Sequence, residues 1–103
     1  MKRGLSRTCY RFFSTLANPT RLAALESLTG GPMNVSEIAG ALEQEQSMIS
    51  HNLRPLVRCG FVRVERRGKE RAYHLNTETF EALMDIVESH AERCCPTGGR
   101  CQL

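Results

Sequence analysis

Three of the five cysteines of this 103-residue chain lie within its last ten residues, and they are the residues best placed to do chemistry. Cys94 and Cys95 are adjacent, and Cys101 follows after a proline and a pair of glycines. The proline ends a helix and the glycines let the chain fold back, so the three thiolates can converge. Three sulfur donors suit a thiophilic, three-coordinate ion such as As(III) or Sb(III).

Other chemistries are open to the same tail. Zinc prefers four ligands, and His90, one helical turn before Cys94, could complete a site of three cysteines and one histidine. Oxidation of Cys94, Cys95 or Cys101 would instead make a thiol-redox switch. A tail that holds no ligand is the simplest alternative.

The remaining cysteines, Cys9 and Cys59, stand at an apolar position and at a helix end of the sequence pattern. A cysteine at such a position usually packs as a small hydrophobic side chain, so we expect both to be buried. The odd total of five argues against the disulfide framework of a secreted protein.

A length of 103 residues, with 41% hydrophobic and 24% charged residues, is typical of a single domain. No stretch approaches the roughly 18 apolar residues of a membrane span, and no apolar signal core follows the first residues. We therefore expect a cytoplasmic protein without a membrane partner. Because His51, His74 and His90 are scattered and no phosphate loop or nucleophile–base–acid set is present, we expect no enzyme.

Apolar spacing predicts four helices, a β-hairpin and a last helix. The helices run from Leu5 to Leu16, from Pro19 to before Gly30, from Val35 to Leu42, and from near Gln46 to before Cys59. Asn18 and Asn34 can cap the second and third of them, and Leu22, Leu25 and Leu28 fall on one face of the second. Residues 61–66 and 71–75 alternate as strands around a basic turn, and Asn76 or Thr77 caps the last helix.

Positive charge gathers on one segment. Residues 54–71 hold seven basic and two acidic residues, a net charge of +5, whereas residues 76–103 have a net charge of −3. The basic segment covers the outer face of the second helix of a helix-turn-helix and then the hairpin. Because such a helix enters the major groove of DNA, we expect it to read base edges and the hairpin to reach phosphates. The expected DNA contacts are Gln46, Ser47, Ser50, His51 and Arg54 on the helix and Arg66, Arg67 and Lys69 on the hairpin. A solvated face, with charges that block sheet-to-sheet aggregation, is the alternative.

Five segments resemble the ArsR/SmtB family of arsenical-resistance-operon repressors, over roughly residues 8–92. They are Leu16-Ala17-Asn18-Pro19-Thr20-Arg21-Leu22, Val35-Ser36-Glu37-Ile38-Ala39, Gln46-Ser47-Met48-Ile49-Ser50-His51-Asn52-Leu53, Gly60-Phe61-Val62 and Arg67-Gly68-Lys69. The resemblance implies a mainly α winged helix-turn-helix with a β-hairpin, of order ααααββα. It also implies a homodimeric repressor that binds an inverted-repeat operator in double-stranded DNA and releases it on sensing a metal or metalloid.

The expected organisation is a winged-helix DNA-binding and dimerisation domain over residues 1–93 and a cysteine-containing tail over residues 94–103. The first and last helices carry apolar stripes beyond what one small domain needs, so we expect them to pair in the dimer. Packing within one chain is the alternative. Since these helices pair in the family, Cys9 could approach the tail of a partner chain.

The resemblance also bears on the inducer. Some family members place a three-cysteine arsenical site at the C-terminal end, which favours As(III) or Sb(III) at Cys94, Cys95 and Cys101, with Zn less favoured. The expected function is repression of a metal(loid)-resistance operon, and the alternative is a zinc- or thiol-redox-responsive repressor of the same fold.

Four residues depart from the family pattern. Glu43 and Glu45 stand where the family usually has a glycine turn and a serine cap, and Asn52 stands where a larger basic or apolar residue is common. Pro55 lies inside the expected recognition helix and removes a backbone N–H, which favours a kink there.

Overall fold

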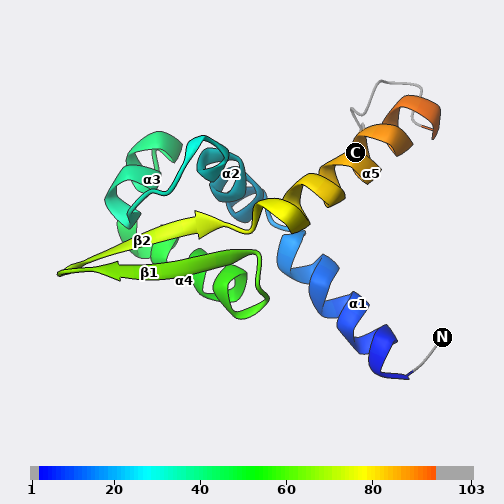
Figure 1. Ribbon diagram of the computed structural model, residues 1–103, viewed down its shortest axis with the longest axis horizontal. Coiled ribbons are helices and arrows are strands. Elements are labelled where there is room, and N and C mark those ends of the chain that lie inside the picture. Colours follow the sequence, from blue (N-terminus) through cyan, green and yellow to red (C-terminus); the bar gives the residue numbers. More distant parts are fainter. Residues whose placement is uncertain (1–2, 95–103) are drawn as a thin grey trace.

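The computed structural model describes residues 3–94, and it has the predicted winged helix-turn-helix order (Figure 1). The elements are α1 (Arg3–Leu16), α2 (Pro19–Ser27), the 3-10 turn η1 (Leu28–Gly30), α3 (Val35–Leu42), α4 (Gln46–Arg58), β1 (Val62–Arg67), β2 (Glu70–Leu75) and α5 (Thr77–Cys94). The 3-10 turn is the one element that the apolar spacing did not predict. Within the described range, no helix has the length and apolar character needed to cross a membrane.

Local capping sets where the helices begin. Asn18 Oδ1 accepts a hydrogen bond from the backbone N–H of Arg21 at 3.1 Å, with Pro19 at the first helical position. Asn34 and Glu37 form the reciprocal capping box at the start of α3, with N···O distances of 2.7 and 3.0 Å. Asn76 Oδ1 accepts from the backbone N–H of Thr79 at the start of α5. The predicted caps Asn18 and Asn34 are confirmed, and of the two candidates for the last helix, Asn76 rather than Thr77 caps α5.

Two turns depend on left-handed backbone. Glu43, which ends α3, has φ 55° and ψ 44°, the conformation that a glycine at the same position would adopt without strain. In the hairpin, Arg67 pairs with Glu70, which leaves a two-residue turn whose Gly68 has φ 62°. Pro55 lies within α4, which continues as a helix to Arg58.

The core lies between α2, α3, α4 and the hairpin. Its members are Leu16, Ala24, Leu25, Leu28, Ile38, Ala39, Ile49, Leu53, Leu56, Phe61, Val62 and Tyr73. Backbone hydrogen bonds between Met33 and Tyr73 attach the segment before α3 to the free edge of β2. Leu25 and Leu28 are buried, whereas Leu22 on the same predicted face is exposed, and Ala24 is also buried on α2. The smaller Ala24 side chain lets α2 approach the core closely.

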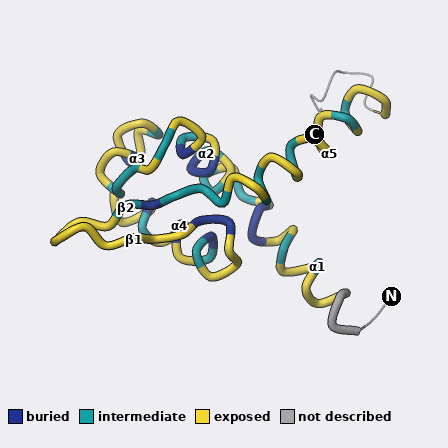
Figure 2. The backbone as a smooth tube through the Cα atoms, viewed as in Figure 1, coloured by how far each residue is buried: buried dark blue, intermediate teal, exposed yellow. Residues whose placement is uncertain are grey.

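Helices α1 and α5 project from this body at the end opposite the hairpin tip, and they diverge from each other (Figure 1). Phe12 on α1 packs against Phe61 of the core, with 5.0 Å between ring centroids. Much of both helices is nevertheless exposed or only partly buried (Figure 2). Their large exposed apolar side chains are Tyr10 and Phe13 on α1 and Ile86 and Val87 on α5.

Candidate nucleic-acid interface

Helix α4 presents two distinct faces. Ile49, Leu53 and Leu56 are at most 1% exposed and fix one face against the core. The opposite face carries the predicted base-reading side chains, of which Ser50 is partly buried and the others are exposed: Gln46, Ser47, Ser50, His51 and Arg54. Apolar packing on one side of α4 therefore brings these polar side chains together on the other side.

The hairpin exposes its basic residues. Arg66, Arg67 and Lys69 are all exposed near the tip. Arg67 Nε lies 3.4 Å from Glu65 Oε1, and both side chains are about half exposed or more, so this ion pair is weak. Arg66 lies directly opposite Arg71 in the strand register, and like charges in that position repel each other. An anion beside the tip would relieve this repulsion.

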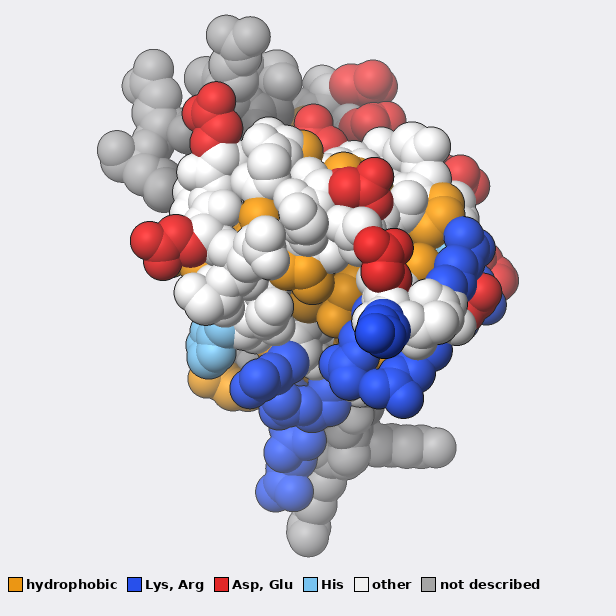
Figure 3. Space-filling model, turned by 90° about the vertical axis from the view of Figure 1, so that its left-hand side faces the viewer, with side chains coloured by type: hydrophobic (Ala, Val, Ile, Leu, Met, Phe, Trp, Pro, Cys, Tyr) orange, Lys and Arg blue, Asp and Glu red, His pale blue; other side chains and the backbone are white. Residues whose placement is uncertain are grey.

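Basic side chains form one band on the face that presents the hairpin tip to the viewer, and acidic side chains lie mainly on the other side of that view (Figure 3). The basic side chains of residues 54–71, the segment with a net charge of +5, are all exposed. A polyanion is the natural partner of such a surface, because concentrated like charge raises the local concentration of counter-charged ligands.

A groove separates α4 from the hairpin. Three arginines, Arg54, Arg58 and Arg71, stand along an apolar lining formed by Leu53, Val57, Val64 and Tyr73. Arg58 and Arg71 contribute to the net charge of residues 54–71 but are not among the predicted DNA contacts. The strand register would have identified Arg71, since it pairs with Arg66. This groove suits a sugar–phosphate strand, with cations for the phosphates and apolar side chains for the sugars.

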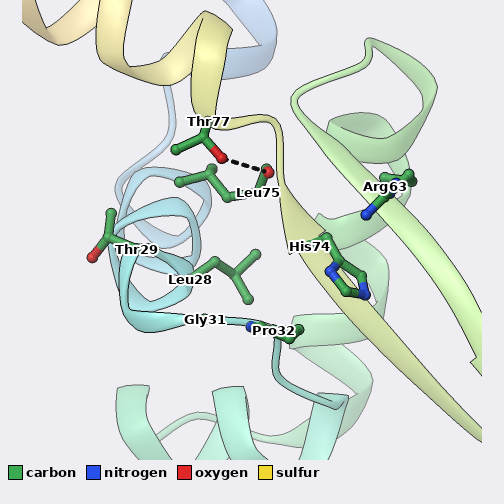
Figure 4. A pocket seen from close by; sticks show the side chains of 8 residues that line it. All are labelled: Leu28, Thr29, Gly31, Pro32, Arg63, His74, Leu75 and Thr77. Atoms are coloured by element: carbon green, nitrogen blue, oxygen red, sulfur yellow. Dashed lines mark hydrogen bonds between the residues drawn. The ribbon is translucent and has the colours of Figure 1, made fainter.

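A second cavity lies between the η1 turn and the hairpin (Figure 4). Its polar lining includes Arg63 and His74, which pair across the strands. Side chains alternate along a strand, so Arg63 and Val64 point to opposite faces of the hairpin. The His74 Nε2 atom lies 3.4 Å from Glu65 Oε2 and makes no hydrogen bond. This cavity is therefore separate from the groove beside α4.

Three of the five cysteines, Cys9, Cys59 and Cys94, lie within the described residues. Cys94 is the exposed last residue of α5, whereas Cys95 and Cys101 lie outside the described residues. His90 is exposed on the same helix, one turn before Cys94. Between Arg3 and Cys94, no three His, Cys, Asp or Glu side chains gather as metal ligands. The predicted three-cysteine site remains a prediction.

The expectation that Cys9 and Cys59 are buried is wrong for Cys59. Cys9 is partly buried on α1, whereas Cys59 is exposed. Cys59 follows the last turn of α4, where the chain turns at the domain surface, and its Sγ lies 3.3 Å from Thr15 Oγ1. A polar partner thus replaces the apolar packing that the sequence pattern predicts.

The chain is similar to known proteins of one family. Residues 18–64, from the cap of α2 into β1, match the family described as bacterial regulatory protein, arsR family. The chain is 39% identical over 77 residues to the HTH-type transcriptional regulator NmtR of Mycobacterium tuberculosis, which is 75% of this chain and 64% of that one. It is 38% identical over 66 residues to a probable mercury resistance operon repressor of Streptomyces lividans, which is 64% of this chain and 53% of that one. It thus spans less than two thirds of the length of both relatives.

Two further proteins are covered more fully. The transcriptional repressor SdpR of Bacillus subtilis is 32% identical over 69 residues, which are 67% of this chain and 77% of that one. The homodimeric winged helix-turn-helix DNA-binding domain of Mb0332 from Mycobacterium bovis, a possible ArsR-family regulator, superposes with a TM-score of 0.79. That match has 27% identity and covers 99% of this chain and 96% of the other. The chain therefore belongs to the arsR family of bacterial regulatory proteins, whose members are DNA-binding regulators and not enzymes.

Proposed function

We propose that this protein is a transcriptional repressor that binds an inverted-repeat operator in double-stranded DNA as a homodimer. The observation that carries the proposal is the outer face of α4, which is polar, largely exposed and flanked by a basic hairpin. An α-helix fits the major groove, and amide, hydroxyl, imidazole and guanidinium groups can hydrogen-bond base edges there.

Two sets of side chains take different roles on the DNA. Gln46, Ser47, Ser50, His51 and Arg54 read bases, because they share the outer face of α4. Arg66, Arg67 and Lys69 on the hairpin bind phosphates, which adds affinity without sequence preference. DNA phosphates also relieve the repulsion between Arg66 and Arg71 across the strands.

Helices α1 and α5 form the dimer interface. A largely apolar groove runs between them, lined by six apolar side chains and by Glu78 and Thr79: Phe12, Phe13, Ala82, Leu83, Ile86 and Val87 are the apolar ones. A second copy related by two-fold symmetry would cover this surface with the same side chains. The homodimeric state of the similar Mb0332 domain supports this arrangement.

The proposed inducer is As(III) or Sb(III), bound by Cys94, Cys95 and Cys101. Cys94 is an exposed thiol at the end of α5, the helix that we place in the dimer interface. A relative described as a probable mercury resistance operon repressor supports a soft, sulfur-seeking ion. Gathering the tail around the ion would change the angle of α5 and misplace the two α4 helices. A coupling free energy of about 1–3 kcal/mol would weaken operator binding roughly 5–150-fold.

The test is an operator-binding assay titrated with arsenite and zinc in parallel, on an operator selected from a pool of random DNA. Arsenite should release the wild-type dimer, and the variant with Cys94, Cys95 and Cys101 all changed to serine should bind the operator but not release it. The variant Cys9→Ser is the matched control and should respond normally. Release of the triple variant by arsenite would place the inducer site elsewhere, and failure of the wild type to bind any selected DNA would refute the repressor proposal.

Exposed thiols at Cys59 and Cys94 favour a second candidate, a thiol-redox-responsive repressor. Mass spectrometry of protein treated with arsenite, zinc or peroxide separates the two. One bound arsenic with three protected thiols supports the metalloid sensor, and a disulfide that forms under mild peroxide and releases DNA supports the redox sensor.

A further inference from the structure

Arg21 on α2 connects two other helices. Its Nε donates a hydrogen bond to Asn52 Oδ1 on α4 at 3.1 Å, and its Nη1 donates to the carbonyl oxygen of Thr15 on α1 at 3.2 Å. Asn52 in turn donates from Nδ2 to the carbonyl oxygen of Met48, one turn earlier on α4. The guanidinium group therefore joins the last turn of α1 to the middle of the proposed recognition helix.

A second contact joins the same turn of α1 to the end of α4. Thr15 Oγ1 lies 3.3 Å from the Sγ of Cys59, which caps α4. Thr15 and Asn52 are only 7% and 8% exposed, so breaking these hydrogen bonds would leave buried polar groups unpaired. Asn52 and Cys59 are about two helical turns apart, so α4 is held at two points along its length. Two points of attachment fix its direction as well as its position.

We call Thr15, Arg21, Asn52 and Cys59 the polar linkage. Contacts between aliphatic side chains are not directional, whereas hydrogen bonds prefer a narrow range of angles. Because α1 projects from the body, a small rotation at its base would move its far end considerably (Figure 1). The polar linkage acts at that base and restrains this rotation.

We infer that the polar linkage determines which spacing of operator half-sites the dimer accepts. In a two-fold dimer that pairs through α1, the angle between α1 and α4 sets the separation of the two recognition helices. A rigid angle accepts one half-site spacing, and a loose angle accepts several. This inference rests on the proposed function, since it needs a dimer that binds two half-sites.

The experiment compares dissociation constants for operators whose half-site spacing is lengthened or shortened by one or two base pairs. Asn52→Leu removes the acceptor for Arg21 while keeping a similar side-chain volume, and Arg21→Lys keeps the charge but loses the fork of donors. Both variants should reduce the discrimination between the preferred and the shifted spacings about tenfold, within the usual range for coupled sites. Their affinity for random DNA and its salt dependence should stay unchanged, because the phosphate contacts are intact.

Controls separate this role from general stability. Asn52→Asp keeps the acceptor for Arg21 but loses the donor to the carbonyl oxygen of Met48, so it should discriminate better than Asn52→Leu. Asn34→Ala weakens only the cap of α3 and should leave discrimination as in the wild type. Circular dichroism establishes that each variant is folded, and Arg21→Lys carries the test if Asn52→Leu does not fold. A wild-type dimer that selects a spacing, together with folded variants that select it equally well, would overturn the inference and leave the proposed function intact. A wild type that binds no operator would refute the proposed function itself.

Discussion

The body of the domain and the two helices that project from it use apolar residues differently. In α2, α3 and α4, the side chains of Leu25, Ile38, Ile49, Leu53 and Leu56 are less than 2% exposed. On α1 and α5, Tyr10, Phe13 and Ile86 are 74%, 61% and 68% exposed. One copy of the chain thus completes the core that positions α4, whereas the apolar surface of α1 and α5 stays uncovered in a single copy. The first region explains how the residues that we propose to contact DNA are positioned, and the second explains why we expect a dimer.

The largest expected effect comes from disrupting the proposed dimer interface on α1 and α5. Ile86→Asp removes an apolar contact twice in a two-fold dimer and adds a charge to each copy. Burial of an isoleucine contributes about 1.5–3 kcal/mol, so the dimer dissociation constant should rise roughly 10²- to 10⁴-fold. Sedimentation equilibrium measures the change, and operator affinity should fall with it. An unchanged dimer would mean that Ile86 lies outside the interface.

The next largest effect is expected from a substitution in the apolar core of the body. Leu56 is fully buried, so Leu56→Ala should lower the free energy of unfolding by about 2–5 kcal/mol. Urea titration measures this loss, and it should be similar at every protein concentration. Ile86→Asp should instead act through the concentration dependence of unfolding, because it acts on association. If both variants showed the same concentration dependence, the distinction between the two regions would be lost.

A smaller effect separates the hairpin from α5 in DNA binding. Arg66→Ala and Lys69→Ala should each weaken binding to all DNA sequences and reduce the slope of log K against log salt by about 0.9, the loss of one phosphate contact. Arg93→Ala on α5 is the matched control and should leave the slope unchanged, because Arg93 lies on the helix that we assign to the dimer. Equal slopes for the hairpin variants and the wild type would remove the hairpin from the interface.

The smallest expected effects come from two substitutions at helix α3, in the body of the domain. Asn34→Ala removes one half of the capping box of α3 and should lower the free energy of unfolding by about 1 kcal/mol. Gly40→Ala on the same helix should raise it by about 0.5–1 kcal/mol, since nothing lies within 4 Å of the added Cβ. Thermal unfolding in parallel measures both. If both variants changed the free energy of unfolding in the same direction, either the capping role of Asn34 or the open space at Gly40 would be contradicted.

Most of the fold could be predicted from the sequence because its signals are local. Asn18 and Asn34 cap helices a few residues away, and the glycine of the hairpin turn lies between the strands that it joins. The outer face of α4 followed from the periodicity of Ile49, Leu53 and Leu56. These interactions connect residues that are close in the chain, so spacing alone reveals them.

The polar linkage could not be predicted in this way. Arg21 and Asn52 are 31 residues apart, and Thr15 and Cys59 are 44 apart, so no periodicity connects them. Asn52 also occupies a buried position, where apolar spacing predicts a hydrophobic side chain. The exposure of Cys59 was missed for the same reason, because its contact is to a distant hydroxyl group.

The pairing of Arg66 with Arg71 has a consequence for the free protein. Two like charges at directly opposed positions on neighbouring strands destabilise the end of the hairpin, and an anion beside them offsets this effect. Local opening of the hairpin should therefore be more frequent in the free protein than on DNA, and amide hydrogen exchange near the tip should slow when any polyanion is added. The hairpin thus gains part of its folding free energy from its ligand, because an anion beside the two arginines offsets their repulsion.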